Sequence, residues 1–161
     1  MNSIQSRFVS WSGEDRKIGE LVEKRLEGKL SDIISDTYNV VYKKAKAEKS
    51  SEERERRKFS YISKGDSQSD YFKTIELVIK YISSHLDLTD YLVGAYATYT
   101  TGLVTALLKS GRLFDGQRDL LLASLIRSVF SDVAVVVHYF VEAVNQKAEA
   151  EKRQAMERRE R

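Results

Sequence analysis

The sequence predicts an all-α fold, and two observations lead to this prediction. The first is that none of the 161 residues is proline, although average usage of about 5% would give roughly 8. No residue therefore forces a helix to stop or kink. The second is that apolar residues recur three and four positions apart in successive segments, as they do in core-facing helices. The length suits one domain with a tail.

The first two predicted helices cover residues 14–29 and 31–47. The apolar stripe of the first consists of Ile18, Leu21, Val22, Leu26 and Leu30. The inward set of the second consists of Ile33, Ile34, Thr37, Tyr38, Val41 and Tyr42. We expect each helix to bury this face in the core.

The third predicted helix, over residues 51–63, is short and charged. Its only strong apolar anchors are Phe59 and Ile62, so we expect most of its surface to face solvent. Gly65 is suited to end this helix, and Asp66 or Ser67 can cap the next one.

Two further helices are predicted over residues 68–86 and 88–110. Asp87 is a suitable cap for the second of them. The first helix has a seam of four- and three-residue steps, which we expect to be buried: Tyr71, Ile75, Val78, Ile82 and His85. The second contains small residues that allow another helix to approach closely: Gly94, Ala95 and Gly102.

The last predicted helix begins near Gln117, after a turn with Asp115 as its cap, and runs to the end of the sequence. Up to about Val144 it is apolar over most of its circumference. This pattern indicates a helix that is central to the fold or shared with a partner.

Beyond Asn145 the same helix becomes charged. Val141, Ala148 and Ala155 are spaced seven apart, as in a weak two-stranded coiled coil. We therefore divide the chain into a domain of residues 1–144 and a helical extension of residues 145–161, which we expect to lead into a further domain.

Composition argues against several classes of protein. The absence of cysteine excludes disulfides, thiolate metal sites and cysteine nucleophiles. The most apolar stretch, residues 120–144, is interrupted by Arg127 and Asp132, and the first residues do not resemble a secretory signal. We therefore predict no membrane span and a cytoplasmic location. The 27 basic and 24 acidic residues are interleaved, which argues against nucleic-acid binding.

Chemical motifs are not visible in the sequence. It contains no glycine-rich phosphate loop, HExxH, GxSxG or EF-hand spacing, and its only histidines are His85 and His138. We predict that the chain is not an enzyme and holds no metal. The many tyrosines in predicted core helices need partners for their hydroxyls. Either a partly polar cavity or backbone carbonyls can supply those partners.

A family resemblance begins at the segment Tyr91-Leu92-Val93-Gly94-Ala95-Tyr96. It resembles the W-Y-I-G-A-Y run that opens a core helix in the protoglobin-like domains of globin-coupled sensors. The same register places other residues on family positions, namely Tyr71, Gly65, Phe59 and the pair Thr37-Tyr38. Phe130-Ser131-Asp132-Val133 is similar to the L-F-D-M run of the family's last helix.

The resemblance, which covers residues 14–143, implies a globin-like fold with an extra N-terminal helix. It also implies a homodimer formed through the last two long helices, and a final helix that continues into a chemoreceptor signalling region or a cyclic-nucleotide output domain. From this we expect Arg127, Asp132 and Val136 at the dimer interface.

The sequence departs from the family at the haem ligand. The family's proximal histidine belongs to an H-x-x-x-G-L-x-P-x-W-Y pattern, and Ile82 occupies its place here. Isoleucine cannot bind iron, and His85 lies three residues later, about one helical turn away. Tyr38 matches the distal tyrosine that contacts bound oxygen in haem-containing relatives.

These observations lead to the hypothesis of a haem-free sensor domain that relays a cytoplasmic cue through a dimeric helix bundle. We expect a vestigial pocket formed by Tyr38, Phe59, Ile82, His85 and Tyr96, with a small apolar or anionic ligand. Two alternatives remain open: a haem-based oxygen sensor with His85 as axial ligand, and a helical dimerisation scaffold without a ligand.

Overall fold

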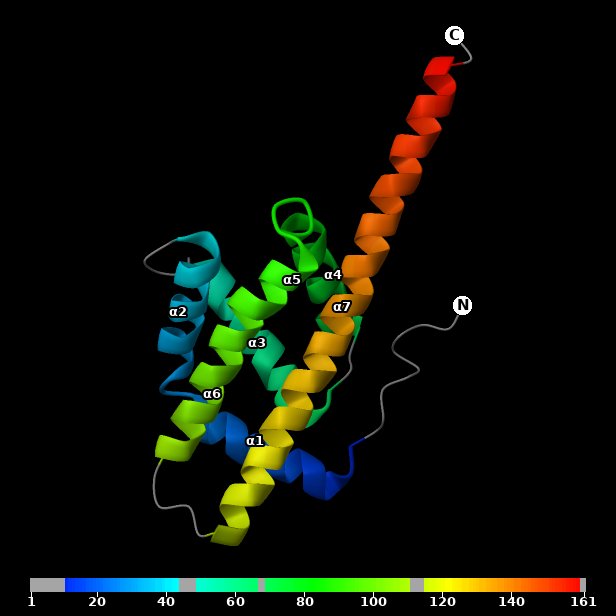
Figure 1. Ribbon diagram of the computed structural model, residues 1–161. Coiled ribbons are helices and arrows are strands. Elements are labelled where there is room, and N and C mark those ends of the chain that lie inside the picture. The colour runs from blue at the N-terminus through cyan, green and yellow to red at the C-terminus, as the bar shows by residue number, and fades with distance from the viewer. Residues whose placement is uncertain (1–10, 44–48, 67–68, 111–114, 160–161) are drawn as a thin grey trace.

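The computed structural model describes residues 11–43, 49–66, 69–110 and 115–159, and these residues form helices and no strand. The prediction of an all-α fold is confirmed. In chain order the elements are α1 (Gly13–Leu26), α2 (Leu30–Tyr42), α3 (Lys49–Lys64), α4 (Ser69–Ile82), α5 (Leu88–Asp90), η2 (Tyr91–Tyr96), α6 (Ala97–Lys109) and α7 (Asp115–Arg159) (Figure 1).

Helix α1 is fixed at its start by a capping box. The Ser12 side chain accepts a hydrogen bond from the Asp15 backbone N–H at 3.1 Å, and Asp15 accepts one from the Ser12 N–H at 3.0 Å. The helix then crosses α3 at close range. A Cβ atom added to Gly19 would lie 1.7 Å from the Ser63 carbonyl oxygen, so only glycine permits this approach.

Helix α3 ends as the sequence predicts. Gly65 follows its last residue with φ +66°, in the left-handed region that favours glycine. A Cβ atom there would lie 2.3 Å from the Trp11 ring. Ser67, the alternative cap for the next helix, lies outside the described residues.

Residues 88–109 form one continuous helical run in which the middle part is π-helical. Asp87 caps this run as predicted, because its side chain accepts a hydrogen bond from the Asp90 N–H at 2.8 Å. Gly102 also has the predicted role, since a Cβ atom at that position would lie 3.0 Å from the Ile33 side chain of α2. The π-helical segment Tyr91–Tyr96 is not foreseen by the apolar periodicity.

The core lies where α4, α6 and α7 meet α1, α2 and α3. The anchors predicted for α3 are confirmed, since Phe59 and Ile62 are 1% and 6% exposed. Two sequence expectations were wrong. Leu21 is 41% exposed, and His85 follows the end of α4 and is exposed, because the helix stops at Ile82.

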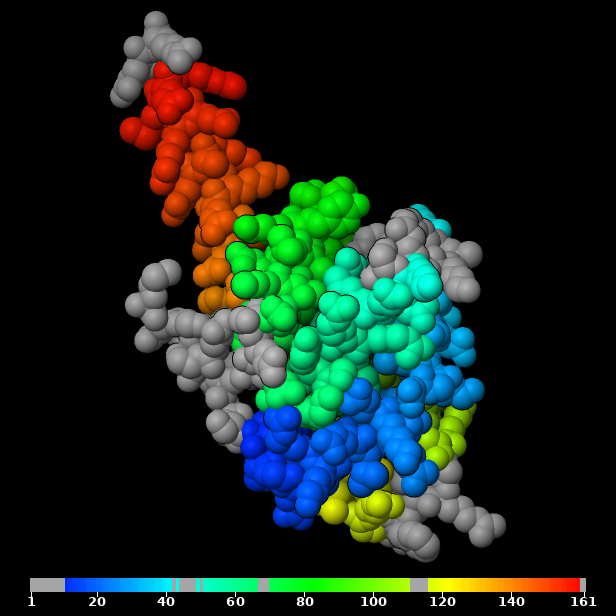
Figure 2. Space-filling view, turned by 180° about the vertical axis from the view of Figure 1, so that it is seen from behind, coloured from blue at the N-terminus to red at the C-terminus, as the bar shows by residue number. Residues whose placement is uncertain are grey.

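Helix α7 runs the length of the body, and its C-terminal part stands clear of the other helices, as both overall views show (Figures 1 and 2). By length and composition, the segment Gly116–Arg159 could cross a membrane, with a mean hydropathy of 2.0 in its most apolar window. The core helix of a soluble protein meets the same criteria, and 44% of that window is buried inside this fold.

Candidate functional site

Five side chains from four helical segments form a polar cluster inside the protein. We call them the buried polar cluster: Glu55 and Lys58 of α3, Tyr71 of α4, Tyr96 of η2 and Asp132 of α7. The cluster joins the helices that surround the centre of the fold to the long C-terminal helix.

Asp132 is the centre of the cluster and is fully buried. The Tyr71 hydroxyl donates a hydrogen bond of 2.7 Å to its Oδ1, and the Tyr96 hydroxyl donates one of 2.6 Å to its Oδ2. The Lys58 Nζ lies 3.3 Å from the same Oδ2. A buried carboxylate is costly unless charges and donors compensate it, and here a cation and two hydroxyls do so.

Lys58 connects the cluster to the edge of the fold. Its Nζ lies 3.0 Å from Glu55 Oε2, and it stands 5.5 Å and 5.4 Å from the ring centroids of Tyr96 and Tyr99, within the range of cation–π attraction. Burial by itself lowers the pKa of Lys58, but the charges of Asp132 and Glu55 outweigh this effect. The pKa of Lys58 therefore lies well above its ordinary value, and the side chain carries its charge.

The tyrosines of the cluster remain protonated for a related reason. Burial raises the pKa of Tyr71 and of Tyr96 well above the ordinary value, and the negative charge of Asp132 raises both further. Burial also raises the pKa of Tyr99, against the opposing effect of Lys58. These hydroxyls are thus available as hydrogen-bond donors at neutral pH.

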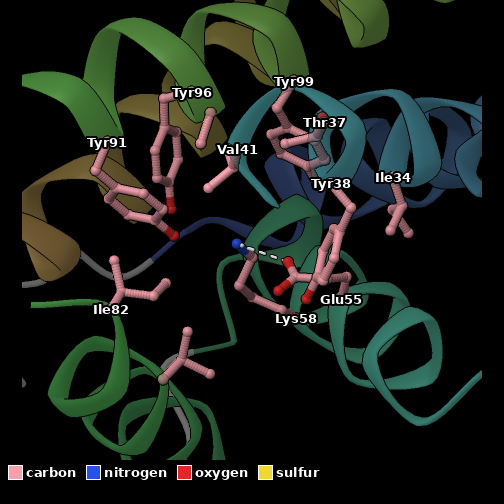
Figure 3. A pocket seen from close by; sticks show the side chains of 12 residues that line it. Ile34, Thr37, Tyr38, Val41, Glu55, Lys58, Ile82, Tyr91, Tyr96 and Tyr99 are labelled. Carbon is pink, nitrogen blue, oxygen red and sulfur yellow. Dashed lines mark ion pairs between the residues drawn. The ribbon is translucent and has the colours of Figure 1, made fainter. Parts of the chain in front are cut away.

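A cavity adjoins the cluster on the side of α2 and η2 (Figure 3). Its volume, as the space open to the centres of water molecules, is about 40 Å³. Polar residues and apolar residues both line it, and they are Thr37, Tyr38, Glu55, Lys58, Tyr91, Tyr96, Tyr99, Ile34, Val41, Val78, Ile82 and Ala95. The cavity can therefore hold a few waters or one small molecule with a polar end and an apolar end.

The π-helical segment shapes one wall of this cavity. Its hydrogen bonds run to the fifth residue along the chain, which gives a wider turn than in an α-helix. Tyr91, Ala95 and Tyr96 are all buried and all line the cavity. Tyr96, the last residue of this segment, lines the cavity and also donates to Asp132.

Three of the five predicted pocket residues lie together around this cavity. Tyr38, Ile82 and Tyr96 all line it, and the Tyr38 hydroxyl accepts a hydrogen bond of 3.2 Å from Arg54. Phe59 does not line the cavity, because its side chain is packed in the core. His85 lies outside it as well, in a surface groove between residues 83–88 and 140–145.

The residues predicted for a dimer interface have different positions. Arg127 is on the surface, where it forms an ion pair of 2.9 Å with Asp15 and its guanidinium lies 4.2 Å from the centre of the Trp11 ring. Asp132 and Val136 are 0% and 1% exposed. Their prediction as interface residues was wrong, because the periodicity of α7 places them on the face that packs against its own chain.

The haem group that the family resemblance implies does not fit the residues of this cavity. Ordinary small-molecule pockets measure about 300–1,000 Å³, whereas this cavity measures about 40 Å³. Ile82 offers no ligand atom, and the His85 Nδ1 lies 2.8 Å from the Tyr81 carbonyl oxygen, outside the cavity. Within the described ranges, no group of three or more histidine or acidic residues is arranged to hold a metal ion.

Sequence reasoning missed Glu55 and Lys58, because both belong to a charged segment that was expected to be solvated. A signal was available. Counting back from Ile62 and Phe59 in steps of three and four reaches positions 58 and 55, so the buried face of α3 continues into its charged part.

Comparisons of this chain with protein-family models, with curated proteins and with solved structures found no match. The evidence for function is therefore the cavity and the adjoining buried polar cluster.

Proposed function

We propose that this chain is a globin-like, haem-free sensory domain, in which a small molecule in the cavity changes the position of α7 within a homodimer. One observation carries the proposal: Lys58 lines the cavity and also pairs with Asp132 of α7 at 3.3 Å. Any ligand that draws Lys58 toward the cavity changes the charge balance around a fully buried carboxylate on the output helix.

An exposed apolar strip on α7 supports a second copy of the chain as the partner. Phe130, Val141 and Val144 are 70%, 48% and 49% exposed. With the exposed Ala134 and Ala148 and the half-buried Val137, they are separated by steps of four and three, as in the seam of a two-stranded coiled coil. The strip continues beyond the body of the domain, and replaces Asp132 and Val136 as the proposed interface.

The strip and Asp132 of the buried polar cluster lie on opposite faces of α7. Phe130 and Asp132 are two residues apart, which is about 200° around the helix axis. A rotation or shift of α7 that adjusts Asp132 therefore also moves the proposed dimer seam. Small helix shifts of this kind are a known mode of signal transmission, and residues 145–159 would carry it toward an output domain.

The position of α7 in the dimer provides the test. Because the chain has no cysteine, Ala150→Cys gives a single spin-label site on the extension, and pulsed electron-spin measurements report the distance between two labels. We expect one intermolecular distance that changes in Lys58→Gln and is unaffected by Lys17→Met on the surface of α1. A monomer would contradict the proposed dimer. A dimer with the same distance in all three proteins would instead indicate a passive scaffold.

The haem-free part of the proposal has its own measurement. Protein purified from cells supplied with a haem precursor should show no visible absorption band of bound haem. A haem band that His85→Ala abolishes would overturn this part and indicate an oxygen sensor.

A further inference from the structure

Tyr99 lines the cavity, and the fold leaves its hydroxyl unsatisfied. This hydroxyl is buried and has no hydrogen-bond partner within the described part of the chain, and Tyr99 itself is 5% exposed. Buried hydroxyls nearly always have a partner. A partner for Tyr99 that lies in the cavity is therefore expected.

Lys58 offers a second donor close to Tyr99. An ammonium group has three N–H donors, and two of them are directed to Glu55 and Asp132. The Nζ lies 5.4 Å from the centre of the Tyr99 ring. A molecule in the cavity can thus accept hydrogen bonds from both Tyr99 and Lys58, while the Glu55 carboxylate at the cavity wall can accept one from it (Figure 3).

The charges around the cavity favour a neutral molecule. Lys58 is already shared between two carboxylates, Glu55 and Asp132. Arg54 is a further cation at the cavity, but its guanidinium donates to the Tyr38 hydroxyl on the cavity wall. An anion would add a third negative charge beside Lys58, and like charges in a desolvated site are unfavourable.

The volume and the apolar wall limit the size of the molecule. One water needs about 10–15 Å³ of such space, so about 40 Å³ accepts roughly three waters or a molecule of about four non-hydrogen atoms. Ile34, Val41 and Val78 line the cavity as well, which suits a methyl group.

From these observations, we infer that the cavity binds a small neutral molecule with a carbonyl or hydroxyl head and a short apolar end, held by Tyr99 and Lys58. This inference rests on the proposed function and names its ligand class. With about four non-hydrogen atoms, the dissociation constant is no tighter than roughly tens of micromolar.

Acetamide and acetate form a matched pair of probes, because they have the same shape and differ in charge. Each is titrated into isotope-labelled protein while the backbone amide resonances of residues around the cavity are followed. Xenon serves as a purely apolar probe of the same cavity. We expect acetamide to bind the wild-type protein and Tyr81→Phe, a surface control, and to bind Tyr99→Phe roughly 3- to 10-fold more weakly. Ala95→Val, which fills the cavity, should abolish binding.

Several outcomes would overturn the inference. These are acetate binding as tightly as acetamide, xenon alone binding, equal acetamide binding by Tyr99→Phe and Tyr81→Phe, or no shift with any probe. The readout is independent of dimer formation. Acetamide binding by a monomer would support this site and contradict the proposed signalling dimer. A dimer whose inter-label distance changes in Lys58→Gln, but which does not bind acetamide, would support the signalling dimer and contradict this site.

Discussion

Removing the Asp132 carboxylate should destabilise the protein strongly. In Asp132→Ala, Lys58 loses a partner at 3.3 Å, and the hydroxyls of Tyr71 and Tyr96 lose their acceptors at 2.7 Å and 2.6 Å. Removing one member of a buried ion pair costs about 3–5 kcal/mol, and a hydrogen bond to a charged group contributes about 1.5–3 kcal/mol. These effects overlap, so we expect a loss of about 3–5 kcal/mol in the free energy of unfolding.

Urea unfolding followed by far-ultraviolet circular dichroism measures this loss. Asp36→Ala, an exposed aspartate on α2, is the control and should change the free energy of unfolding by no more than about 0.5 kcal/mol. If Asp132→Ala is too unstable to measure, Tyr71→Phe tests the same cluster by removing one hydrogen bond to Asp132. Its expected loss in the free energy of unfolding is about 1.5–3 kcal/mol.

The outcome that would refute this reasoning is a loss below about 1 kcal/mol for Asp132→Ala with an unchanged denaturant slope. The coupling with Lys58 provides a further check. Because each single variant breaks the same Lys58–Asp132 ion pair, the double variant Lys58→Met/Asp132→Ala should lose less than the sum of the two, by about 0.5–3 kcal/mol.

Three other predictions concern packing and protonation. Gly19→Ala should lower the free energy of unfolding by about 1–3 kcal/mol or more, since its Cβ would lie 1.7 Å from the Ser63 carbonyl oxygen; in the same urea assay Gly13→Ala, with open space around it, should not. Stability should fall as pH rises above about 10, by up to about 1.4 kcal/mol per pH unit for each group concerned. The reason is that the lysine and tyrosines of the buried polar cluster have raised pKa values, so they keep protons that the unfolded chain releases. Equal urea midpoints on both sides of that pH would contradict this. Finally, Arg127→Ala should raise the pKa of Asp15 from about 2 toward 3.8, because the hydrogen bond from Arg127 is the largest cause of its lowering; carboxyl carbon resonances report the change.

The helices could be predicted from the sequence because apolar spacing and capping residues are local signals. Asp87 and Gly65 mark helix boundaries through their own backbone and side-chain chemistry, and the structure has both where the sequence indicates them. The prediction that His85 is buried in the helix seam was wrong, because the apolar spacing continues past Ile82 whereas the helix ends there. No local rule distinguishes the last residue of a seam from the first residue of a loop.

The site could be predicted only in part, because its chemistry depends on contacts between distant segments. Tyr38, Ile82 and Tyr96 were found through the family register and do line one cavity. Lys58 meets Asp132 across 74 positions of sequence, and no spacing rule connects them. The burial of Asp132 also reversed the prediction for it: the family resemblance suggested an interface between chains, but its partners are in its own chain.

The buried polar cluster is hard to explain by stability alone. Replacing a buried ion pair with well-packed apolar side chains is often neutral or stabilising, so a protein selected only for stability has little need of Lys58 and Asp132 in its core. We therefore expect the variant Lys58→Met/Tyr71→Phe/Tyr96→Phe/Asp132→Leu to be more stable to urea than Asp132→Ala. In the spin-label assay, we expect acetamide to change the distance between copies of α7 in the wild-type protein but not in this variant. An apolar variant that still responds would show that the signal reaches α7 by packing rather than by charge, and would assign the cluster a structural role.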